Sequence, residues 1–309
     1  TKVFTYFGFK DYALTGCASQ YAQAHWQTAN QQKPLPLYVP EDCNTLQEAV
    51  ERVEHDPRIT TIILGKGDHR INGAYLEIVS SMGIVGRPDV PKEEIVVLGG
   101  VAFDVDLVFQ NYGRVCHLQH LTLRGATGNG VMGCSSFTME DIIVEQCGYS
   151  GVVANGYGVV GRCTNMEVRQ CGWSGVKADN DASMTLIGAK TTVHHNCTTG
   201  DEGFPSWDPP GYQELWGAGF HTLPTPTGDH YGLHVSSSSS STIELVSPLT
   251  KEQVATDNGG GGNWGGSGGA GIKQIQTIAA ATPTVPVGET KSNHGSATRR
   301  DDLLRLPDH

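Results

Sequence analysis

The sequence predicts an all-β fold, a solenoid in which one short unit of strands and turns is repeated. Three stretches share a valine-rich strand, a corner and a Gly-Val re-entry: LRGATGNGVMG (123–133), VEQCGYSGVVANG (144–156) and VRQCGWSGVKADN (168–180). The stretches align without a gap, and the equivalent glycines, Gly130, Gly151 and Gly175, are spaced 21 and 24 residues apart. Such a period is typical of a solenoid, because each coil needs its neighbour to bury its apolar side.

The composition suits a turn-rich β protein and excludes some functions. The 309 residues include 40 glycines, 17% are charged, and the formal net charge is -11. This acidic balance argues against a nucleic-acid partner, since such binding depends on basic patches. No apolar run approaches the roughly 20 residues of a membrane helix, so no membrane partner is expected.

The first 71 residues predict helices and the start of the solenoid. Residues 1–36 are expected to form an aromatic-rich helical unit that ends at Pro34 and Pro36. The strand LYVP (37–40), the helix TLQEAVERVEHDP (45–57) and the strand TTIILGKG (60–67) follow. In the helix, Thr45 and Glu48 form an expected capping box, and apolar residues recur at helical spacing. We expect this helix to cover the open end of the solenoid.

Further strands are expected at LEIV (76–79), IVVLG (95–99) and LVFQ (107–110), before clear repeats from about 115 to 200. The period then breaks, because the corner at Asp201 is followed by a Gly-apolar re-entry only at Tyr231-Gly232-Leu233. Residues 201–229 are therefore predicted to be a loop inserted at one corner, a position that often serves binding.

The end of the chain completes the predicted solenoid. After the insertion we expect strands at HYGLHV (230–235) and TIELV (242–246), and a short helix in SPLTKEQV (247–254) with Ser247 as cap and Pro248 in its first turn. A glycine-rich loop (259–271), the strand IKQIQTI (272–278) and a mostly disordered tail (279–309) follow.

The eight cysteines include no C-x-x-C pair, so no zinc site and no metal is expected. Cys147 and Cys171 fall at the corner that Ala126 and Asn196 occupy in neighbouring repeats. A small buried residue explains that position better than a disulfide framework. Reduced thiols favour an intracellular location. No signal peptide is visible, but secretion stays possible if one was removed.

The Gly-Val re-entry, the V-x-x-C/N corners and the helical cap resemble the right-handed parallel β-helix of the pectin-lyase-like superfamily. The resemblance covers residues 37–278 and implies a single-stranded right-handed parallel β-helix with an N-terminal helical appendage and a capping helix. It carries none of the catalytic motifs of polygalacturonases, pectate lyases or alginate epimerases; Asp208-Pro209-Pro210 only echoes the last.

A second resemblance lies near the N-terminus. FGFKDYALTGCASQYAQAHW (7–26) is similar to the latter half of an F-box, although the Leu-Pro opening of an F-box is missing. In some ubiquitin-ligase substrate receptors an F-box precedes a β-helix, so the resemblance implies a protein partner and an intracellular location.

Alternation along each strand predicts which side chains face outward. Before the corner, one residue of each strand points inward, and the residue that follows it points outward. The outward residues, Arg124, Glu145, Arg169 and His194, should form a column across four coils. This column is either ordinary surface salt bridging or part of a binding surface that includes Arg169 and His194.

The strands after the corner predict a second polar group. Lys177 and His234 should be neighbours on adjacent coils if the insertion loops out cleanly, with Asp179 beside Lys177. A base, an acid and a charge stabiliser are what proton abstraction from a sugar needs, so these three residues are the candidate catalytic group. The alternative is an ordinary solvated face.

The predicted insertion is rich in aromatic residues, among them Trp207, Tyr212, Trp216 and Phe220. Such side chains stack on sugars, anchor a protein partner, or fix the loop to its own scaffold. No cofactor motif is present, and the oligomeric state is left open. Two functions follow: a non-catalytic scaffold that recognises a protein or glycan, which we favour, or a polysaccharide lyase or epimerase.

Overall fold

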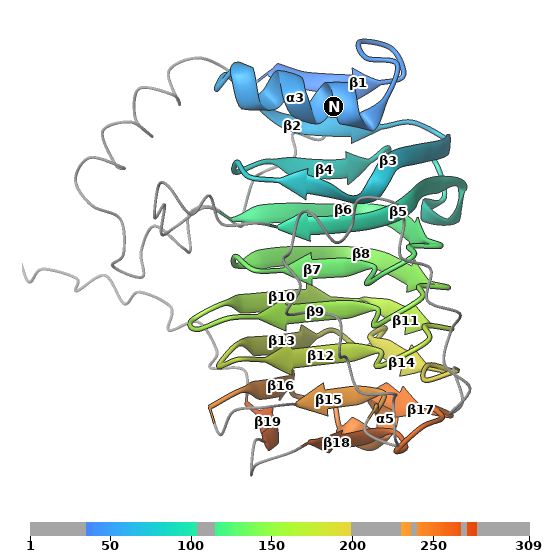
Figure 1. Ribbon diagram of the computed structural model, residues 1–309, viewed down its shortest axis with the longest axis vertical. Coiled ribbons are helices and arrows are strands. Elements are labelled where there is room, and N and C mark those ends of the chain that lie inside the picture. Colours follow the sequence, from blue (N-terminus) through green and yellow to red (C-terminus); the bar gives the residue numbers. More distant parts are fainter. Residues whose placement is uncertain (1–34, 104–114, 199–229, 236–239, 267–270, 277–309) are drawn as a thin grey trace, which may run out of the picture. The chain divides into compact units, whose positions relative to one another are not determined.

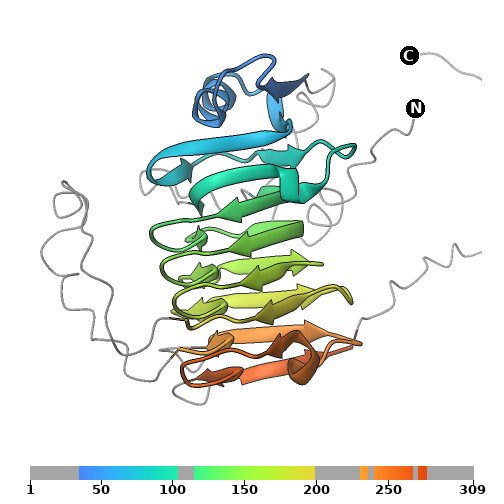
Figure 2. The same ribbon diagram turned by 90° about the vertical axis from the view of Figure 1, so that its right-hand side faces the viewer.

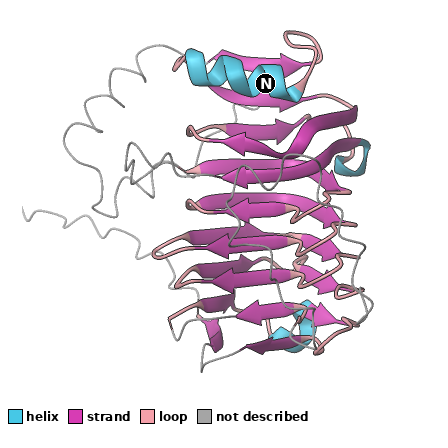
Figure 3. Ribbon diagram, viewed as in Figure 1, coloured by secondary structure: helices cyan, strands magenta, loops and turns pink. Residues whose placement is uncertain are grey.

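The computed structural model describes residues 35–103, 115–198, 230–235, 240–266 and 271–276 (Figure 1). These residues form a parallel β-solenoid of about 8 turns with few helices, which confirms the predicted fold class (Figure 3). All described strands belong to one compact unit and are linked through parallel pairings into one sheet.

The strands of the first coils are β1 (Leu35–Val39), β2 (Ile59–Leu64), β3 (Gly67–Ile78), β4 (Gly83–Gly86), β5 (Ile95–Phe103), β6 (Cys116–Arg124), β7 (Val131–Gly133) and β8 (Phe137–Glu145). Those of the central coils are β9 (Val152–Asn155), β10 (Val160–Thr164), β11 (Glu167–Arg169), β12 (Val176–Asp179), β13 (Ser183–Ile187) and β14 (Thr192–His194). The last are β15 (Leu233–Val235), β16 (Thr242–Val246), β17 (Ala255–Thr256), β18 (Trp264–Gly266) and β19 (Gly271–Ile275).

Each central coil contributes three short strands, and each strand pairs with its counterparts in the coils before and after it (Figure 2). One column contains β7, β9, β12, β15 and β18; a second contains β10, β13, β16 and β19; a third contains β11, β14 and β17. The longer β8 spans two columns, since its first half pairs with β10 and its second half with β11.

The interior is the apolar column that alternation predicts. Residues expected to point inward are 0% exposed on both sides of the corner: Leu123, Val144, Val168, Val193, Val131, Val152, Val176 and Leu233. The expected register also holds, because Val176 pairs with Leu233 across the predicted insertion. The insertion therefore leaves the solenoid register unchanged.

The repeated glycines are required by close packing at the corner. A Cβ atom on Gly151 would lie 2.3 Å from Cγ1 of Val168, and one on Gly175 would lie 2.3 Å from Cγ1 of Val193. The equivalent distance from Gly130 to Val144 is 2.5 Å. Each re-entry glycine thus leaves room for an inward valine of the solenoid.

The corner before each glycine holds a small buried side chain, as expected. Cys147 and Cys171 are 2% and 0% exposed, and Asn196 is 1% exposed. Asn196 replaces a thiol with an amide that donates to the carbonyls of Val168 and His194, at 3.1 Å each. The seven cysteines of the described residues are all free thiols.

The predicted cap helix is α3 (Leu46–His55), which packs against β1, β2 and β3. Its buried side is Leu46, Ala49, Val50 and Val53. Thr45 is the N-cap and accepts a hydrogen bond from the backbone N–H of Glu48 at 3.1 Å. The predicted capping box is one-sided, because the Glu48 carboxylate accepts from the N–H of Asn44 instead of that of Thr45.

Two local predictions near the C-terminal end were wrong. Helix α5 (Lys251–Val254) begins after Thr250, which forms a complete capping box with Gln253, so Ser247 is not the cap. The predicted glycine-rich loop contains β18, whose Trp264 pairs with Leu233 of β15. Pairing with β15 in the preceding coil makes these residues a strand, although glycine has a low strand propensity.

The described strands begin at Leu35, two residues before the predicted start, and end at Ile275. Several predictions lie outside the described residues: nearly all of the helical unit 1–36 with its F-box-like segment, the strand 107–110, all of the insertion 201–229, and the tail 279–309.

Each central coil also contains bends at residues whose backbone is in the left-handed region, which the sequence did not predict. One column of such residues is His120, Asp141, Asn165 and Gly188, and another is Gln146, Gln170, His195 and Asp257. The bend at His120, with φ of 55°, lets Leu118 and Leu121 both point inward although they are three residues apart. Strict alternation of inward and outward residues therefore does not hold across this bend.

Candidate functional site

The predicted Lys177, Asp179 and His234 come together on the outer face of β12 and β15. Lys177 is the Cα partner of His234 in the parallel pairing of these strands. Its Nζ atom forms an ion pair with Oδ2 of Asp179 at 2.9 Å, and these two side chains are 25% and 18% exposed. The sequence prediction of a Lys-Asp pair beside a histidine on the next coil thus matches the geometry.

His234 is far more enclosed than a solvated face would make it, with 7% of the residue exposed. Its Nδ1 atom lies 2.9 Å from Oγ of Ser174, a fully buried hydroxyl. Burial, the positive charge of Lys177 and the neighbouring His230 together lower the pKa of His234 to about 4, while Asp179 opposes the shift. The imidazole is therefore neutral near pH 7 and a weak base.

A stack of aromatic rings lies beside this group. The rings of Tyr149 and Trp173 are 4.1 Å apart between centroids, and those of Trp173 and His230 are 4.9 Å apart, both nearly parallel. His230 and Tyr231 in turn meet the His234 ring edge-on. The sequence analysis did not predict this stack, although the aligned corners CGYSG, CGWSG and DHYG indicate it. Tyr149, Trp173 and His230 each lie two residues before the re-entry glycine, so they occupy the same corner position in successive coils.

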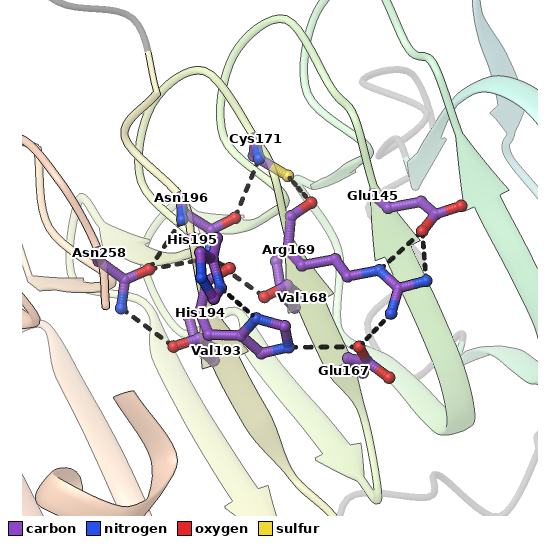
Figure 4. A network of polar contacts seen from close by, with 10 residues as sticks. All are labelled: Glu145, Glu167, Val168, Arg169, Cys171, Val193, His194, His195, Asn196 and Asn258. Carbon is purple, nitrogen blue, oxygen red and sulfur yellow. Dashed lines mark hydrogen bonds and ion pairs between the residues drawn. The ribbon is translucent and has the colours of Figure 1, made fainter. Parts of the chain in front are cut away.

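The outward column before the corner is a connected charge network (Figure 4). Nε of Arg124 lies 2.5 Å from Oε1 of Glu145, and Nη2 of Arg169 lies 2.7 Å from Oε2 of the same carboxylate. Arg169 also contacts Glu167 at 2.6 Å, and Nε2 of His194 contacts Glu167 at 3.2 Å. The predicted register of Arg124, Glu145, Arg169 and His194 is present in the strand pairings.

Glu145 gives this network a buried centre that simple surface pairing does not have. Its side chain is only 4% exposed, whereas those of Arg124 and Arg169 are 37% and 33% exposed. Burial alone raises the pKa of Glu145, but the hydrogen bonds and charges of the two guanidinium groups outweigh burial and hold that pKa below its ordinary value. The column is therefore a fixed, ionised element of the outer face.

A separate polar pocket of about 330 Å³ lies at the left-handed bends, where His120, Asp141 and Asn165 are among its lining residues. Lys92 Nζ and His120 Nδ1 each lie 2.7 Å from an oxygen of Asp141. His120 also donates through Nε2 to the carbonyl of Val90 at 2.9 Å. These contacts hold the segment before β5 against β6 and β8, and none involves a predicted site residue.

The predicted aromatic binding residues Trp207, Tyr212, Trp216 and Phe220 lie outside the described residues. Within the described ranges, no group of three or more His, Cys, Asp or Glu side chains could hold a metal ion. In the same part of the chain, no helix has the length and apolar character needed to span a bilayer.

The structure defines the class of protein as a parallel β-solenoid. No protein-family model, curated protein or solved structure matches the chain.

Proposed function

We propose that this protein is a non-catalytic recognition scaffold, and that a protein partner binds the outer face formed by Trp173, Lys177, Asp179 and their neighbours. The single observation that supports this proposal most strongly is the state of His234. An imidazole with a pKa of about 4, enclosed and hydrogen-bonded to Ser174, is a poor base for removing a proton from a sugar.

The ring stack favours a protein over a glycan as partner. Tyr149 lies against one side of the Trp173 ring and His230 against the other, in nearly parallel arrangements. Because sugar rings pack on an aromatic face, the indole of Trp173 is badly placed for that contact. Tyr and Trp side chains are enriched in protein interfaces.

The proposal is tested by exchanging the two charges of the Lys177–Asp179 pair. The variant Lys177→Asp/Asp179→Lys keeps an ion pair at this position but reverses its direction on the surface. A matched control is Asp56→Arg/Arg58→Asp, since Asp56 and Arg58 form a pair with the same sequence spacing at 2.7 Å near α3. Proteins cross-linked to the wild-type chain are identified by mass spectrometry, purified and titrated against all three forms.

A supporting result is a protein whose affinity falls at least about tenfold in the Lys177–Asp179 exchange and stays unchanged in the control, a loss of about 1.4 kcal/mol or more. Equal affinity for all three forms contradicts the proposal. If the wild-type chain and the control bind a glycan on an array and the Lys177–Asp179 exchange variant does not, the partner of this face is a glycan and the proposal of a protein partner is wrong. Turnover of a polyuronate that Lys177→Ala/His234→Ala abolishes restores the lyase or epimerase alternative.

We further propose membership of the pectin-lyase-like superfamily, an F-box-like role for residues 7–26 and an intracellular location. The Gly-Val repeats and the cap helix support the first assignment, the seven free thiols support the intracellular location, and the F-box-like role rests on the sequence of residues 7–26. Titration of thiols in unreduced protein checks the location: eight reactive thiols after unfolding are expected, and four disulfides contradict it.

A further inference from the structure

The chain contains four Asn-Gly pairs, a dipeptide that can react with itself. The pairs are Asn72-Gly73, Asn129-Gly130, Asn155-Gly156 and Asn258-Gly259. The backbone nitrogen after an asparagine attacks the side-chain amide carbon of that asparagine, and glycine resists this attack least because it has no Cβ atom. In a folded chain the reaction depends on whether the side chain and the next peptide group are free to approach each other.

In three of these pairs the attacking nitrogen is bound to an adjacent coil. The N–H groups of Gly130, Gly156 and Gly259 donate to backbone carbonyl oxygens at 3.0, 3.2 and 2.9 Å. Such a nitrogen must first leave its hydrogen bond, which requires local opening of the solenoid. The reaction at these three pairs is therefore slow as long as the coils stay packed.

The asparagine side chains of the same three pairs are also held. The Oδ1 atoms of Asn129, Asn155 and Asn258 accept hydrogen bonds from residues of adjacent coils at 3.1, 2.7 and 3.0 Å. Each bond fixes the amide group that would be attacked. Both reacting groups are thus restrained in all three pairs.

The pair Asn72-Gly73 differs because it lies in an irregular part of β3. In the pairing of β3 with β5, residues 71–74 lie opposite a single residue, Gly99 (Figure 1). Asn72 and Gly73 are both exposed. Within the described part of the chain, the side chain of Asn72 makes no hydrogen bond. The amide of Asn72 is therefore free to turn toward the next peptide group.

Gly73 also leaves room for the product of the attack. Its φ is 107°, and no atom of the described residues lies within 4 Å of the position that a Cβ atom would occupy. The surplus of residues in β3 lets the main chain shift here without changing the pairing on either side. Ring closure at this pair does not require the solenoid to open.

We propose that Asn72 is a site of spontaneous deamidation in the folded protein and reacts before the other three asparagines. The N–H of Gly73 loses its proton to base in the solvent, and the nitrogen forms a bond to Cγ of Asn72. The bond from Cγ to the amide nitrogen breaks, and ammonia leaves after taking up a proton from water. Water then opens the cyclic imide at either carbonyl carbon, which gives aspartate or isoaspartate. The net reaction consumes one water, releases one ammonia and adds one negative charge to β3.

The test follows the four sites separately by mass spectrometry. The full chain is incubated at mildly alkaline pH, and peptides from samples taken over several weeks are analysed for conversion of amide to acid. Electron-transfer fragmentation identifies isoaspartate. We expect Asn72 to react at least about tenfold faster than each of the other three sites, because these react only after local opening. Equal rates at the four sites of the folded chain overturn the proposal.

A second incubation separates the effect of the fold from that of the neighbouring residues. In guanidinium chloride the hydrogen bonds between coils are lost, so the four pairs are expected to react at similar rates. The same preference for Asn72 in the unfolded chain overturns the structural argument.

The variant Asn72→Gln tests the chemical route. It keeps an exposed amide at this position, but its longer side chain would have to form a larger ring, so we expect no conversion of residue 72 to an acid over the same period. Conversion of Gln at position 72 as fast as that of Asn72 would show direct hydrolysis by water and overturns the proposed attack by Gly73.

Discussion

Oγ of Ser174 lies 2.9 Å from Nδ1 of His234, and both residues are buried although the register places His234 on the outer face. Alternation predicts a solvent-exposed side chain for His234, but the contact with Ser174 is enclosed by the protein. It ties the corner before β12 to the strand β15 of the next coil. The same contact fixes the neutral imidazole beside the Lys177–Asp179 pair.

The first prediction concerns stability against acid. The pKa of His234 is about 4 in the folded chain, below the ordinary value near 6.5, so the unfolded chain binds more protons between these two pH values. Stability therefore rises with pH across this window and is lost as pH falls from about 6.5 to 4, by up to about 3 kcal/mol from this group. His234→Gln is expected to flatten the dependence of unfolding free energy on pH, measured by urea titration.

Part of the slope should remain in that variant, since burial also lowers the pKa of His117. A His234→Gln protein with the same slope as wild type would contradict the assignment of the shift to His234.

The second prediction concerns the re-entry glycines. Gly151→Ala places a methyl group 2.3 Å from Cγ1 of Val168 and 2.7 Å from the carbonyl oxygen of Gly175. Such overpacking costs about 1–3 kcal/mol. Gly271→Ala is the control, because the new methyl group would lie 3.5 Å from Cε of Lys273, which is an ordinary contact with a flexible side chain. Equal melting temperatures for the two variants would contradict the prediction, because they would show that the corner at Gly151 accommodates a methyl group without loss of stability.

The sequence made the coil predictable because two simple constraints repeat in it. A Cβ atom at a re-entry glycine would collide with an inward valine, which is Val144, Val168 or Val193. The glycines therefore mark the corner of each coil, and alternation then identifies the inward residues on either side of it. Together they placed Lys177 and His234 side by side across a long interruption. Residue spacing alone was enough, since parallel strands in register translate sequence alignment directly into contact.

The features that the sequence did not reveal depend on side-chain burial and on left-handed bends. Nothing in the repeat distinguishes Glu145, which is 4% exposed, from its more exposed partners in the same column. His120 and His195 adopt positive φ without a glycine signal, and each bend shifts the alternation that follows it. Asparagine, aspartate and histidine accept this conformation more readily than most residues, so the signal was present but weak.

The third prediction concerns the amide at the corner of β14. The Nδ2 group of Asn196 donates to the carbonyls of Val168 and His194, and its Oδ1 accepts from the N–H of Cys171 at 3.1 Å. Asn196→Ala removes these three hydrogen bonds from buried backbone groups, at an expected cost of about 2–4 kcal/mol. Asn196→Cys should cost less, because a thiol fills this corner in the two preceding coils. The order is measured by chemical denaturation, and a cysteine variant less stable than the alanine variant would contradict the equivalence of these corners.

The fourth prediction concerns the buried centre of the charge network. Glu145→Gln removes the negative charge between Arg124 and Arg169 while keeping the shape of the side chain. The two guanidinium groups are about one-third exposed, so water compensates part of the loss, and we expect destabilisation of about 1–3 kcal/mol at pH 7.

The dependence on pH separates this charge effect from a packing effect. Because the pKa of Glu145 is lower in the folded chain than in the unfolded chain, its ionised form contributes stability above the unfolded value near 4.5, and that contribution is lost as pH falls through the folded value. The difference in unfolding free energy between wild type and Glu145→Gln should therefore shrink as the pH is lowered from 6 toward about 3. A difference that stays constant over this range would assign the cost to packing, and the ion pairs of Glu145 would then contribute little to the stability of the solenoid.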